Sequence, residues 1–411
     1  MTKVPEVPFV RPERGMNMRT AIISVDGHVR ASRSEYRNYV EQRYLDVFDE
    51  WVRAQEAAGA PESGNLSPGL DPTSQWDSDL RLKDMESQGV VAEVLFPNGL
   101  PFQSRPSDDI SGFSDPDLNR QALLAYNRWL VDFCAQVPGR RAGQALVAFD
   151  DVDLAVADIH WAKEHGLGGV MMPALLPGDT FFFDPALDPV WAACVEVGLP
   201  ISQHGGSGAP AYGPPGFAAI MTLALEHSFY SGRSLWQMIF GGVFERFPDL
   251  RVAYVETEAD WIGPVIAKMD RRLDWGDDWT GWAQVLQRSR AFSRRARDYW
   301  ADNCYSGISP FTDSQIPLEE VARPSAEYET FGIGCDNAMF GVDYPHFESV
   351  FPDTATQVEA LVAHPAITNE VAQKILCGNA ARVYGFDLAR LQPEMERVGF
   401  DIEGKAVERP G

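Results

Sequence analysis

The stretch Ala21-Ile-Ile-Ser-Val-Asp-Gly-His28 decides the fold class, because it holds the first apolar run of the chain and the turn that follows. Such a run predicts a buried strand at Ala21–Val25. Open α/β sheets usually carry a glycine-rich G-x-G-x-x-G turn after their first strand. Here the turn is Asp26-Gly-His28, and no such motif follows. The stretch therefore favours a barrel over an open sheet.

Further apolar runs alternate with amphipathic stretches along the chain, which is the pattern of βαβ units. The other predicted strands are Val90–Phe96, Gln144–Ala148, Gly169–Met172, Pro200–Gln203, Arg251–Val255, Asn303–Gly307 and Ala338–Val342. The predicted helices are Asp79–Gln88, Asp151–His165, Pro189–Val197, Ser234–Phe244, Gly263–Leu273, Thr354–Ala363 and Asn369–Cys377. Together the strands and helices predict an α/β fold, a (β/α)₈ TIM barrel.

The predicted barrel spans residues 20–390, between an N-terminal arm (1–19) and a C-terminal tail (391–411). Two insertions, at about 29–78 and 206–220, do not fit a minimal barrel. Both follow strand C-termini, which form the face where barrel active sites lie. We expect lids or substrate walls there, with plain surface loops as the alternative.

The composition excludes some classes of partner. The chain has 35 Lys and Arg against 59 Asp and Glu, a net charge of −24. Such a surface repels nucleic acid and anionic lipid, so we expect neither as a partner. No apolar run approaches the ~18 residues of a membrane helix. The five cysteines form no C-x-x-C pair, and the start of the chain lacks a hydrophobic signal core, so we predict reduced thiols and a cytoplasmic location.

Four side chains are predicted to converge on a divalent metal at the barrel mouth. Asp26 and His28 share parity at the end of the first strand and therefore point to the same side. His204 follows the fifth strand and precedes two glycines, and Asp343 ends the eighth strand, which closes beside the first. Nitrogen and oxygen ligands of this kind suit Zn, Mn or Fe.

Other polar residues at the same face are candidates for catalysis or for a second metal. Glu256 ends the sixth strand, and His346 and Glu348 follow Asp343. The extra carboxylates favour Mn or Fe over Zn, and they supply enough ligands for one ion or two. The alternatives are a solvated rim for the glutamates and a supporting hydrogen bond for His346.

Three residues near the second insertion have either a substrate-binding or a structural role. Arg233 can clamp a substrate carboxylate with two hydrogen bonds, or cap a helix. His227 and Trp261 are further candidates for contact with substrate or with the metal ligands. His160, His165 and His364 lie on or at the ends of predicted helices, and we interpret them as structural.

Several motifs resemble the amidohydrolase-related family, the branch of the amidohydrolase superfamily that includes aminocarboxymuconate semialdehyde decarboxylase and related nonoxidative decarboxylases. The resemblance runs from about residue 20 to 386. It rests on Asp26-Gly-His28, His204, Gly242-Val-Phe-Glu-Arg-Phe-Pro-Asp-Leu-Arg-Val-Ala-Tyr-Val-Glu256, Trp261, Gly341-Val-Asp-Tyr-Pro-His346 and Gly378-Asn-Ala-Ala-Arg-Val-Tyr384.

The resemblance implies roles for single residues. Asp26 and His28 match the family's first-strand metal pair, His204 the third ligand and Asp343 the fourth. It also implies that Asp343 accepts a proton from a metal-bound water, and that the protein is at least a dimer, either a homo-oligomer or a hetero-oligomer with a related subunit.

The chain departs from the family pattern at three places. The first ligand is Asp26, where relatives usually have histidine. The fourth strand ends in Val170-Met-Met-Pro173, without a lysine that could bridge two metals. The sixth strand ends in Glu256, where many relatives place a catalytic histidine.

These observations predict a metal-dependent enzyme that acts on a small, carboxylate-bearing organic substrate by hydrolysis or nonoxidative decarboxylation. One alternative is an O₂-dependent monooxygenase with a dinuclear Fe or Fe/Mn centre, motivated by the extra carboxylates. A second alternative is a partner subunit of a hetero-oligomeric enzyme.

Overall fold

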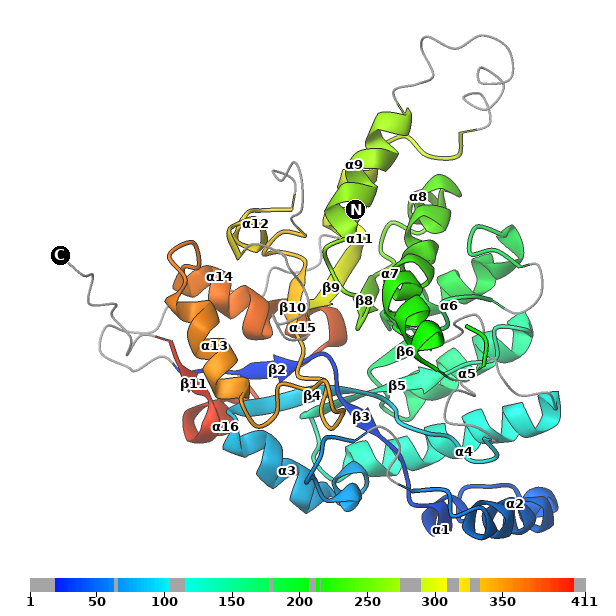
Figure 1. The fold of residues 1–411 in the computed structure, drawn as a ribbon. Coiled ribbons are helices and arrows are strands. Elements are labelled where there is room, and N and C mark those ends of the chain that lie inside the picture. Colours follow the sequence, from blue (N-terminus) through cyan, green and yellow to red (C-terminus); the bar gives the residue numbers. More distant parts are fainter. Residues whose placement is uncertain are drawn as a thin grey trace.

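The fold is seen in a computed structural model that describes residues 19–62, 66–103, 115–176, 180–206, 212–214, 216–273, 290–308, 318–325 and 333–402. Its main sheet has the strand order β10-β9-β8-β7-β6-β5-β4-β2, and every neighbouring pair is parallel (Figure 1). The strands are β1 (Arg19–Thr20), β2 (Ile22–Ser24), β3 (His28–Val29), β4 (Val90–Pro97), β5 (Arg141–Leu146), β6 (Gly169–Met172), β7 (Ile201–His204), β8 (Val252–Val255), β9 (Cys304–Ile308), β10 (Ala338–Phe340) and β11 (Phe400–Asp401).

The two ends of this order meet in a seam between the segments after β2 and β10. The Val25 amide donates to the Phe340 carbonyl at 2.9 Å, and the Asp343 amide donates to the Asp26 carbonyl at 2.9 Å. Gly27 and Tyr344 form a parallel bridge. The sheet therefore closes on itself, and the predicted (β/α)₈ barrel is confirmed. Because the seam joins the first and last strands, it also brings Asp26 beside Asp343.

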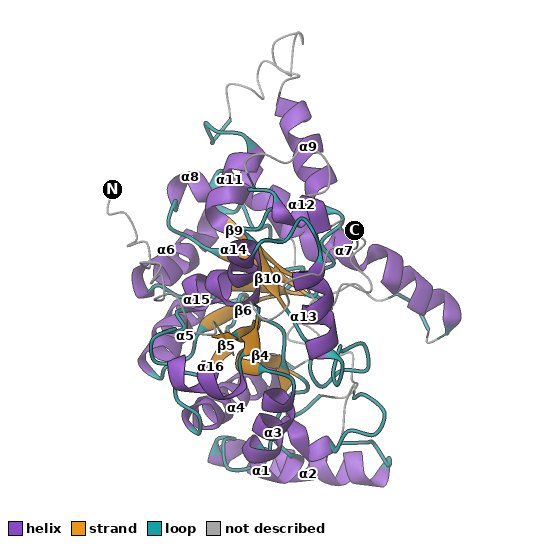
Figure 2. Cartoon of the chain, turned by 90° about the vertical axis from the view of Figure 1, so that its left-hand side faces the viewer, coloured by secondary structure: helices purple, strands orange, loops and turns teal. Residues whose placement is uncertain are grey.

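Helices surround the sheet (Figure 2). They are α1 (Arg33–Tyr36), α2 (Leu45–Ala57), α3 (Ser78–Ser87), α4 (Pro116–Ala135), α5 (Val152–Glu164), α6 (Asp188–Val197), α7 (Phe217–Phe240), α8 (Val243–Arg246), α9 (Ile262–Leu273), α11 (Ala296–Asn303), α12 (Leu318–Ala322), α13 (Thr354–Ala363), α14 (Asn369–Gln373), α15 (Asn379–Tyr384) and α16 (Gln392–Val398). Within the described residues, no helix has the length and apolar character needed to cross a membrane.

Local sequence explains where many helices begin and end. Asp151 caps α5 by accepting a hydrogen bond from the Leu154 amide at 3.0 Å, as aspartate does at helix N-termini. Gly198 ends α6 with φ +72°, a left-handed conformation that costs glycine little. The predicted bounds of these two helices are therefore correct to within one residue at each end.

Two helical predictions were wrong in extent or missing. The helix predicted at Ser234–Phe244 instead begins at Phe217 and ends at Phe240, so the last part of the 206–220 insertion is helical. The 20-residue helix α4 was not predicted. Apolar residues recur along α4 at helical spacing (Leu123, Tyr126, Leu130 and Phe133), and all are buried, so the periodic signal was present in the sequence.

The 29–78 insertion packs onto the barrel. Phe48 of α2 is buried against Phe102, and the Trp51 indole donates to the Gln103 carbonyl at 2.8 Å. Further along, the Ser67 hydroxyl donates to the His346 carbonyl at 2.5 Å. This insertion therefore reaches the residues after β10, as a wall of the barrel mouth is expected to do.

Candidate metal centre

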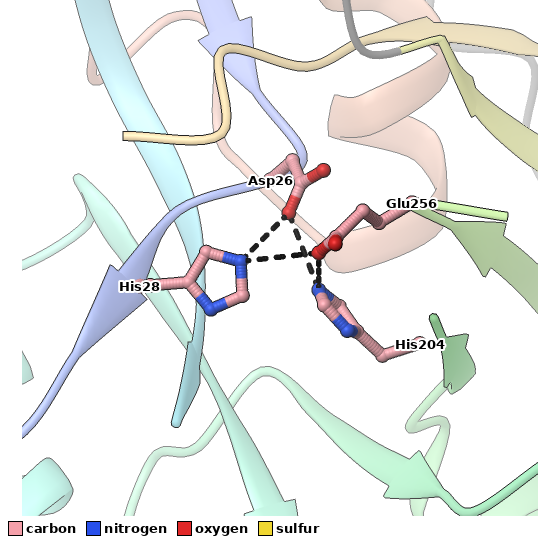
Figure 3. A group of neighbouring side chains, drawn as sticks. All are labelled: Asp26, His28, His204 and Glu256. Carbon is pink, nitrogen blue, oxygen red and sulfur yellow. Dashed lines mark hydrogen bonds and ion pairs between the residues drawn. The ribbon is translucent and has the colours of Figure 1, made fainter. Parts of the chain in front are cut away.

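Two histidines present the same ring nitrogen to one point at the barrel mouth (Figure 3). His28 Nδ1 lies 3.3 Å from the Pro97 carbonyl, and His204 Nδ1 lies 2.8 Å from the Gly205 carbonyl. A carbonyl oxygen can only accept, so in both rings Nδ1 carries the hydrogen. In the neutral form of each ring, Nε2 then has a lone pair that points toward the carboxylates. Backbone control of the tautomer in this way is typical of metal-ligating histidine.

Two carboxylates complete the first group. Asp26 Oδ1 lies 3.3 Å from both His28 Nε2 and His204 Nε2. Glu256 Oε2 lies 3.5 Å from His28 Nε2 and 3.1 Å from His204 Nε2. Ligands held at about 2.1 Å from one cation lie roughly 3–3.5 Å apart when their bonds meet at about 90–110°. The spacing of these four side chains therefore fits a divalent metal.

A second group shares His28 and Glu256 with the first. Asp343 Oδ1 lies 3.2 Å from His28 Nε2 and 2.9 Å from His346 Nδ1. The rings of His28 and His346 are stacked, with centroids 3.8 Å apart. In each group, the potential ligand atoms lie within 4.8 Å of one another. The structure thus places Glu256 beside Asp26, His28 and His204, and places Asp343 beside His28 and His346.

Electrostatics hold Asp26 and Glu256 ionised. Burial raises the pKa of Asp26, but hydrogen bonds to His204 and His28 outweigh burial and bring it well below its usual range. Burial lowers the pKa of His28, yet the close carboxylates of Asp26, Asp343 and Glu256 raise it well above the ordinary value. Buried carboxylates with no lasting positive partner are costly. The group therefore attracts a cation.

Unusual backbone conformations aim two of the carboxylates. Glu256 has φ +51° and Asp343 has φ +58°, a left-handed region that residues other than glycine rarely adopt. His227 of α7 supports the turn at Glu256, because its Nε2 lies 2.7 Å from the Glu256 carbonyl. Gly205 leaves the necessary space, because a Cβ there would lie 1.9 Å from that carbonyl oxygen. His227 thus contacts the metal group through the backbone of Glu256.

A buried arginine supports the group from behind. Arg81 of α3 is fully buried and donates to the His28 carbonyl at 2.9 Å. It also pairs with Glu93 of β4, with Arg81 Nη2 and Glu93 Oε2 2.8 Å apart. Gly27 allows this approach, since a Cβ there would lie 3.0 Å from the guanidinium. Sequence analysis missed Arg81, because a lone arginine on an amphipathic helix carries no signal of burial.

The remaining predicted residues fall into different surroundings. The Trp261 indole donates to the Thr257 and Glu258 carbonyls at 2.8 and 3.0 Å, and its ring packs against Gly232 of α7, which is a structural contact. Arg233 is half-buried on α7 and makes no hydrogen bond with another described residue. Partial burial raises the pKa of Glu348, and the negative charge of Asp343 raises it further. Glu348 is therefore close enough to the group to interact with it electrostatically.

Comparison with known proteins identifies the family of the chain. A family model described as amidohydrolase matches residues 25–386. The chain belongs to this amidohydrolase family. The resemblance found in the sequence is thereby confirmed.

A curated relative matches part of the chain. The chain is 26% identical over 194 residues to 2-amino-3-carboxymuconate-6-semialdehyde decarboxylase of Dictyostelium discoideum. The match covers 44% of this chain and 47% of that relative, so it spans about half the length of the curated protein.

Solved structures share the amidohydrolase barrel. A manganese-bound 5-carboxyvanillate decarboxylase from Novosphingobium aromaticivorans has a TM-score of 0.61 at 19% identity, covering 89% of this chain and 97% of that one. A 2,6-dihydroxybenzoate decarboxylase from Rhizobium has a TM-score of 0.59 at 17% identity, covering 89% and 99%. At these identities the likeness establishes the fold alone.

Proposed function

We propose that this amidohydrolase is a metal-dependent nonoxidative decarboxylase of a small aromatic or unsaturated carboxylic acid. The observation that carries the proposal is the convergence of His28 Nε2 and His204 Nε2 on Asp26 and Glu256. The named decarboxylases that share its family or fold support the choice of reaction.

The metal would be held by Asp26, His28, His204 and Glu256, with Asp343 adjacent. We propose Mn or Fe over Zn, because the group is rich in carboxylates. A divalent cation there would supply charge stabilisation for an oxygen anion of the substrate.

The side chains of the mouth have separate tasks in this reaction. When the bond between carbon and carboxylate breaks, the electron pair stays on the carbon, and a proton must reach that carbon. We propose that His346 carries this proton, because Glu256 would already hold the metal; the His346 side chain is 9% exposed. We propose that Arg233, half-buried on α7, pairs with a second anionic group of the substrate.

The test is turnover of a panel of hydroxybenzoic and unsaturated dicarboxylic acids by protein loaded with Mn²⁺, Fe²⁺ or Zn²⁺. We expect release of CO₂ from at least one acid, lost in His204→Ala together with bound metal. If the fully loaded protein releases CO₂ from none of the panel, the proposed reaction is wrong. His160→Gln, on the exposed side of α5, is the matched control and should keep both metal and turnover.

Hydrolysis is the second candidate, because both oxygens of Asp343 are buried without a hydrogen-bond partner among the described residues. Such a carboxylate can accept a proton from water. Ester and amide substrates in the same assay separate hydrolysis from decarboxylation. None of the relatives reported above is described as an oxygenase, so the comparisons do not support the monooxygenase alternative.

We also propose that the protein is an oligomer formed through α7, which projects from the side of the barrel (Figure 2). Its first 13 residues expose large apolar side chains, with Phe217 81%, Leu225 77% and Phe229 59% exposed. Exposed apolar patches of this kind mark interaction surfaces. A second copy of the chain is the expected partner, with a related subunit as the alternative. Leu225→Lys should lower the mass measured by light scattering, whereas Leu154→Lys on α5 should not.

The proposed location is the cytoplasm. The five cysteines are all buried and unpaired, which is typical of a reducing compartment. Fractionation of the native host would test this.

A further inference from the structure

A small cavity lies at the opposite end of the barrel from the metal group. It is placed between helix α3 and the first residues of β4 and β5, and its volume is about 10 Å³, which is room for one occupant the size of a water molecule. Its lining combines charged side chains with apolar ones, among them Glu93, Arg140, Arg141, Leu82, Met85 and Val137. The charges around the cavity decide which occupant suits it.

Arg141 brings a buried positive charge to this cavity. Its side chain is 1% exposed. Its Nε donates to Glu93 at 3.2 Å, and its Nη1 donates to the Ser78 hydroxyl at 2.9 Å and to the Phe133 carbonyl at 3.0 Å. The third nitrogen, Nη2, is buried and has no hydrogen-bond partner among the described residues. A guanidinium nitrogen can only donate, so Nη2 requires an acceptor from outside this part of the chain.

Glu93 does not neutralise Arg141, because Arg81 binds the same carboxylate. Arg81 is fully buried, and its Nε and Nη2 donate to Glu93 at 2.9 and 2.8 Å. The Phe133 ring, whose centroid lies 4.0 Å from Arg141 Cζ, attracts the guanidinium but offsets its burial less than an opposite charge would. Two buried arginines therefore share one carboxylate, and the group keeps a positive charge.

The same excess of arginine recurs at Arg140, the neighbouring residue in the lining. Its Nη1 donates to Glu86 at 2.7 Å, but Glu86 also accepts from Arg397. Asp84, another carboxylate of α3, accepts from the Tyr344 hydroxyl at 2.6 Å and is not part of the lining. This place is thus positively charged, although the chain as a whole has a net charge of −24.

A water molecule and an anion would meet these needs differently. A water molecule can accept the hydrogen bond from Arg141 Nη2, but it leaves the buried charge in place. A monovalent anion accepts the same hydrogen bond in its stronger, charge-assisted form, and it also cancels the excess charge. The volume of about 10 Å³ is too small for phosphate, sulfate or an organic carboxylate. These conditions favour a monatomic anion, and a chloride ion is only slightly larger than a water molecule.

We propose that the chain binds one chloride ion in this cavity, held by Arg141 Nη2 and close to Arg140. Because Glu93 joins Arg141 to Arg81, an ion at Arg141 stabilises the packing of α3 against β4 and β5. The site does not include any residue of the metal group, so the proposal is independent of the proposed function.

Thermal unfolding of the purified chain tests the proposal. Sodium chloride is replaced stepwise by sodium methanesulfonate at constant ionic strength, because the methanesulfonate ion is too large for the cavity. We expect the Tm to rise with chloride along a saturating curve, by at least about 2 °C, since a ligand that binds only the folded chain stabilises it. Equal Tm values in the two salts at every concentration would overturn the proposal.

Bromide locates the ion directly, because it can replace chloride and scatters X-rays anomalously. Crystals soaked in sodium bromide should show an anomalous peak within hydrogen-bond distance of Arg141 Nη2. An ordered water molecule at that place, without anomalous signal, would overturn the proposal even if every variant failed to fold.

A variant links the effect on Tm to this cavity. Arg141→Met removes the charge and the donor, and it leaves Glu93 paired with Arg81 alone. The folded variant should lose both the chloride-dependent rise in Tm and the bromide peak. Arg246→Met is the matched control, because Arg246 forms an exposed pair with Asp188, and it should keep both. If Arg141→Met, folded by circular dichroism, keeps the full rise in Tm, the assignment is wrong.

Discussion

Glu256 stores backbone strain in order to reach the metal group. Its φ of +51° puts it in the left-handed region, which costs residues with a Cβ about 1–3 kcal/mol. Strain of this kind persists where the surrounding structure holds it, here through His227 on the Glu256 carbonyl. The strained residue is also a proposed metal ligand, so the proposal implies that folding stability and metal binding oppose one another at this position.

A pair of substitutions isolates that strain. Glu256→Gly and Glu256→Ala both remove the carboxylate, but only glycine relaxes at positive φ. We expect the free energy of unfolding of the metal-free glycine variant to exceed that of the alanine variant by about 1 kcal/mol, measured with urea. At Glu196, in the exposed part of α6, the order should reverse because glycine weakens helices. An alanine variant at least as stable as the glycine variant at 256 would show that the turn is unstrained.

The rule that side chains at strand C-termini meet was enough to bring Asp26, His28, His204 and Asp343 together from sequence. The same rule put Glu256 at the barrel mouth as a candidate for catalysis or for a second metal, but it could not show that Glu256 lies beside Asp26, His28 and His204, because the positive φ at this residue leaves no signal in the sequence. It also missed Asn98, whose Oδ1 lies 3.0 Å from His346 Nε2, although this residue comes directly after the second strand. An amide has too many ordinary roles for its position alone to single it out.

At the scale of elements, Arg81 joins α3 to the seam of the barrel. Its guanidinium binds Glu93 of β4 and the His28 carbonyl at once, and Glu93 also accepts from Arg141 of β5 at 3.2 Å. One fully buried side chain therefore connects helix α3, strand β4 and the turn that carries His28. Removing a partner from such a network costs more than the same change at the surface.

Arg81→Lys keeps the positive charge but loses the planar guanidinium, whose N–H groups donate to Glu93 and to the His28 carbonyl together. We expect the free energy of unfolding to fall by about 2–4 kcal/mol and metal affinity to fall with it, although Arg81 touches no metal. Chemical denaturation and metal titration measure the two effects. Arg37→Lys, in an exposed pair with Asp49, is the control and should cost less than about 1 kcal/mol. Equal losses at both positions would contradict the argument.

Elements were predictable where periodicity and caps agree, as at α5 and α6. The start of α7 was not, because the residues from Phe217 onward are apolar on several faces and lie in a segment rich in glycine and proline. A helix whose apolar side chains are exposed does not show the one-sided pattern of a core-facing helix. The missing one-sided pattern is itself explained if another chain covers α7.

At the scale of the molecule, the C-terminal segment closes back on the beginning of the barrel. β11 pairs antiparallel with β1, and Arg397 of α16 binds Glu86 of α3, which Arg140 also contacts at 2.7 Å. The hydrogen bond from Arg397, joined by Arg140 and opposed by partial burial, lowers the pKa of Glu86 to about 2.

This lowered pKa predicts a pH-dependent contribution to stability. The ordinary pKa of the group is 4.5, so the contribution is complete above pH 4.5 and is lost as the pH falls through 2. We expect Glu86→Gln to have a lower Tm than the unmodified chain at pH 7, and the difference to shrink below pH 4.5. Glu370→Gln, an exposed glutamate 3.7 Å from Lys374, should show little difference at any pH. If the difference in Tm between Glu86→Gln and the unmodified chain grows as the pH falls below 4.5, the prediction is wrong.

Because the seam joins the segments after β2 and β10, the barrel can close only late in synthesis of the chain. Asp26 and His28 leave the ribosome early, but their neighbour across the seam, Asp343, is made roughly 300 residues later, which takes about 15–60 s at 5–20 residues per second. Until then β2 has a free edge on one side, and the seam that fixes Asp26 and His28 relative to the other proposed ligands cannot form. A nascent chain stalled before Asp343 should therefore take up no tightly bound ion. Metal uptake by ribosome-bound chains of increasing length would report the moment at which the barrel closes.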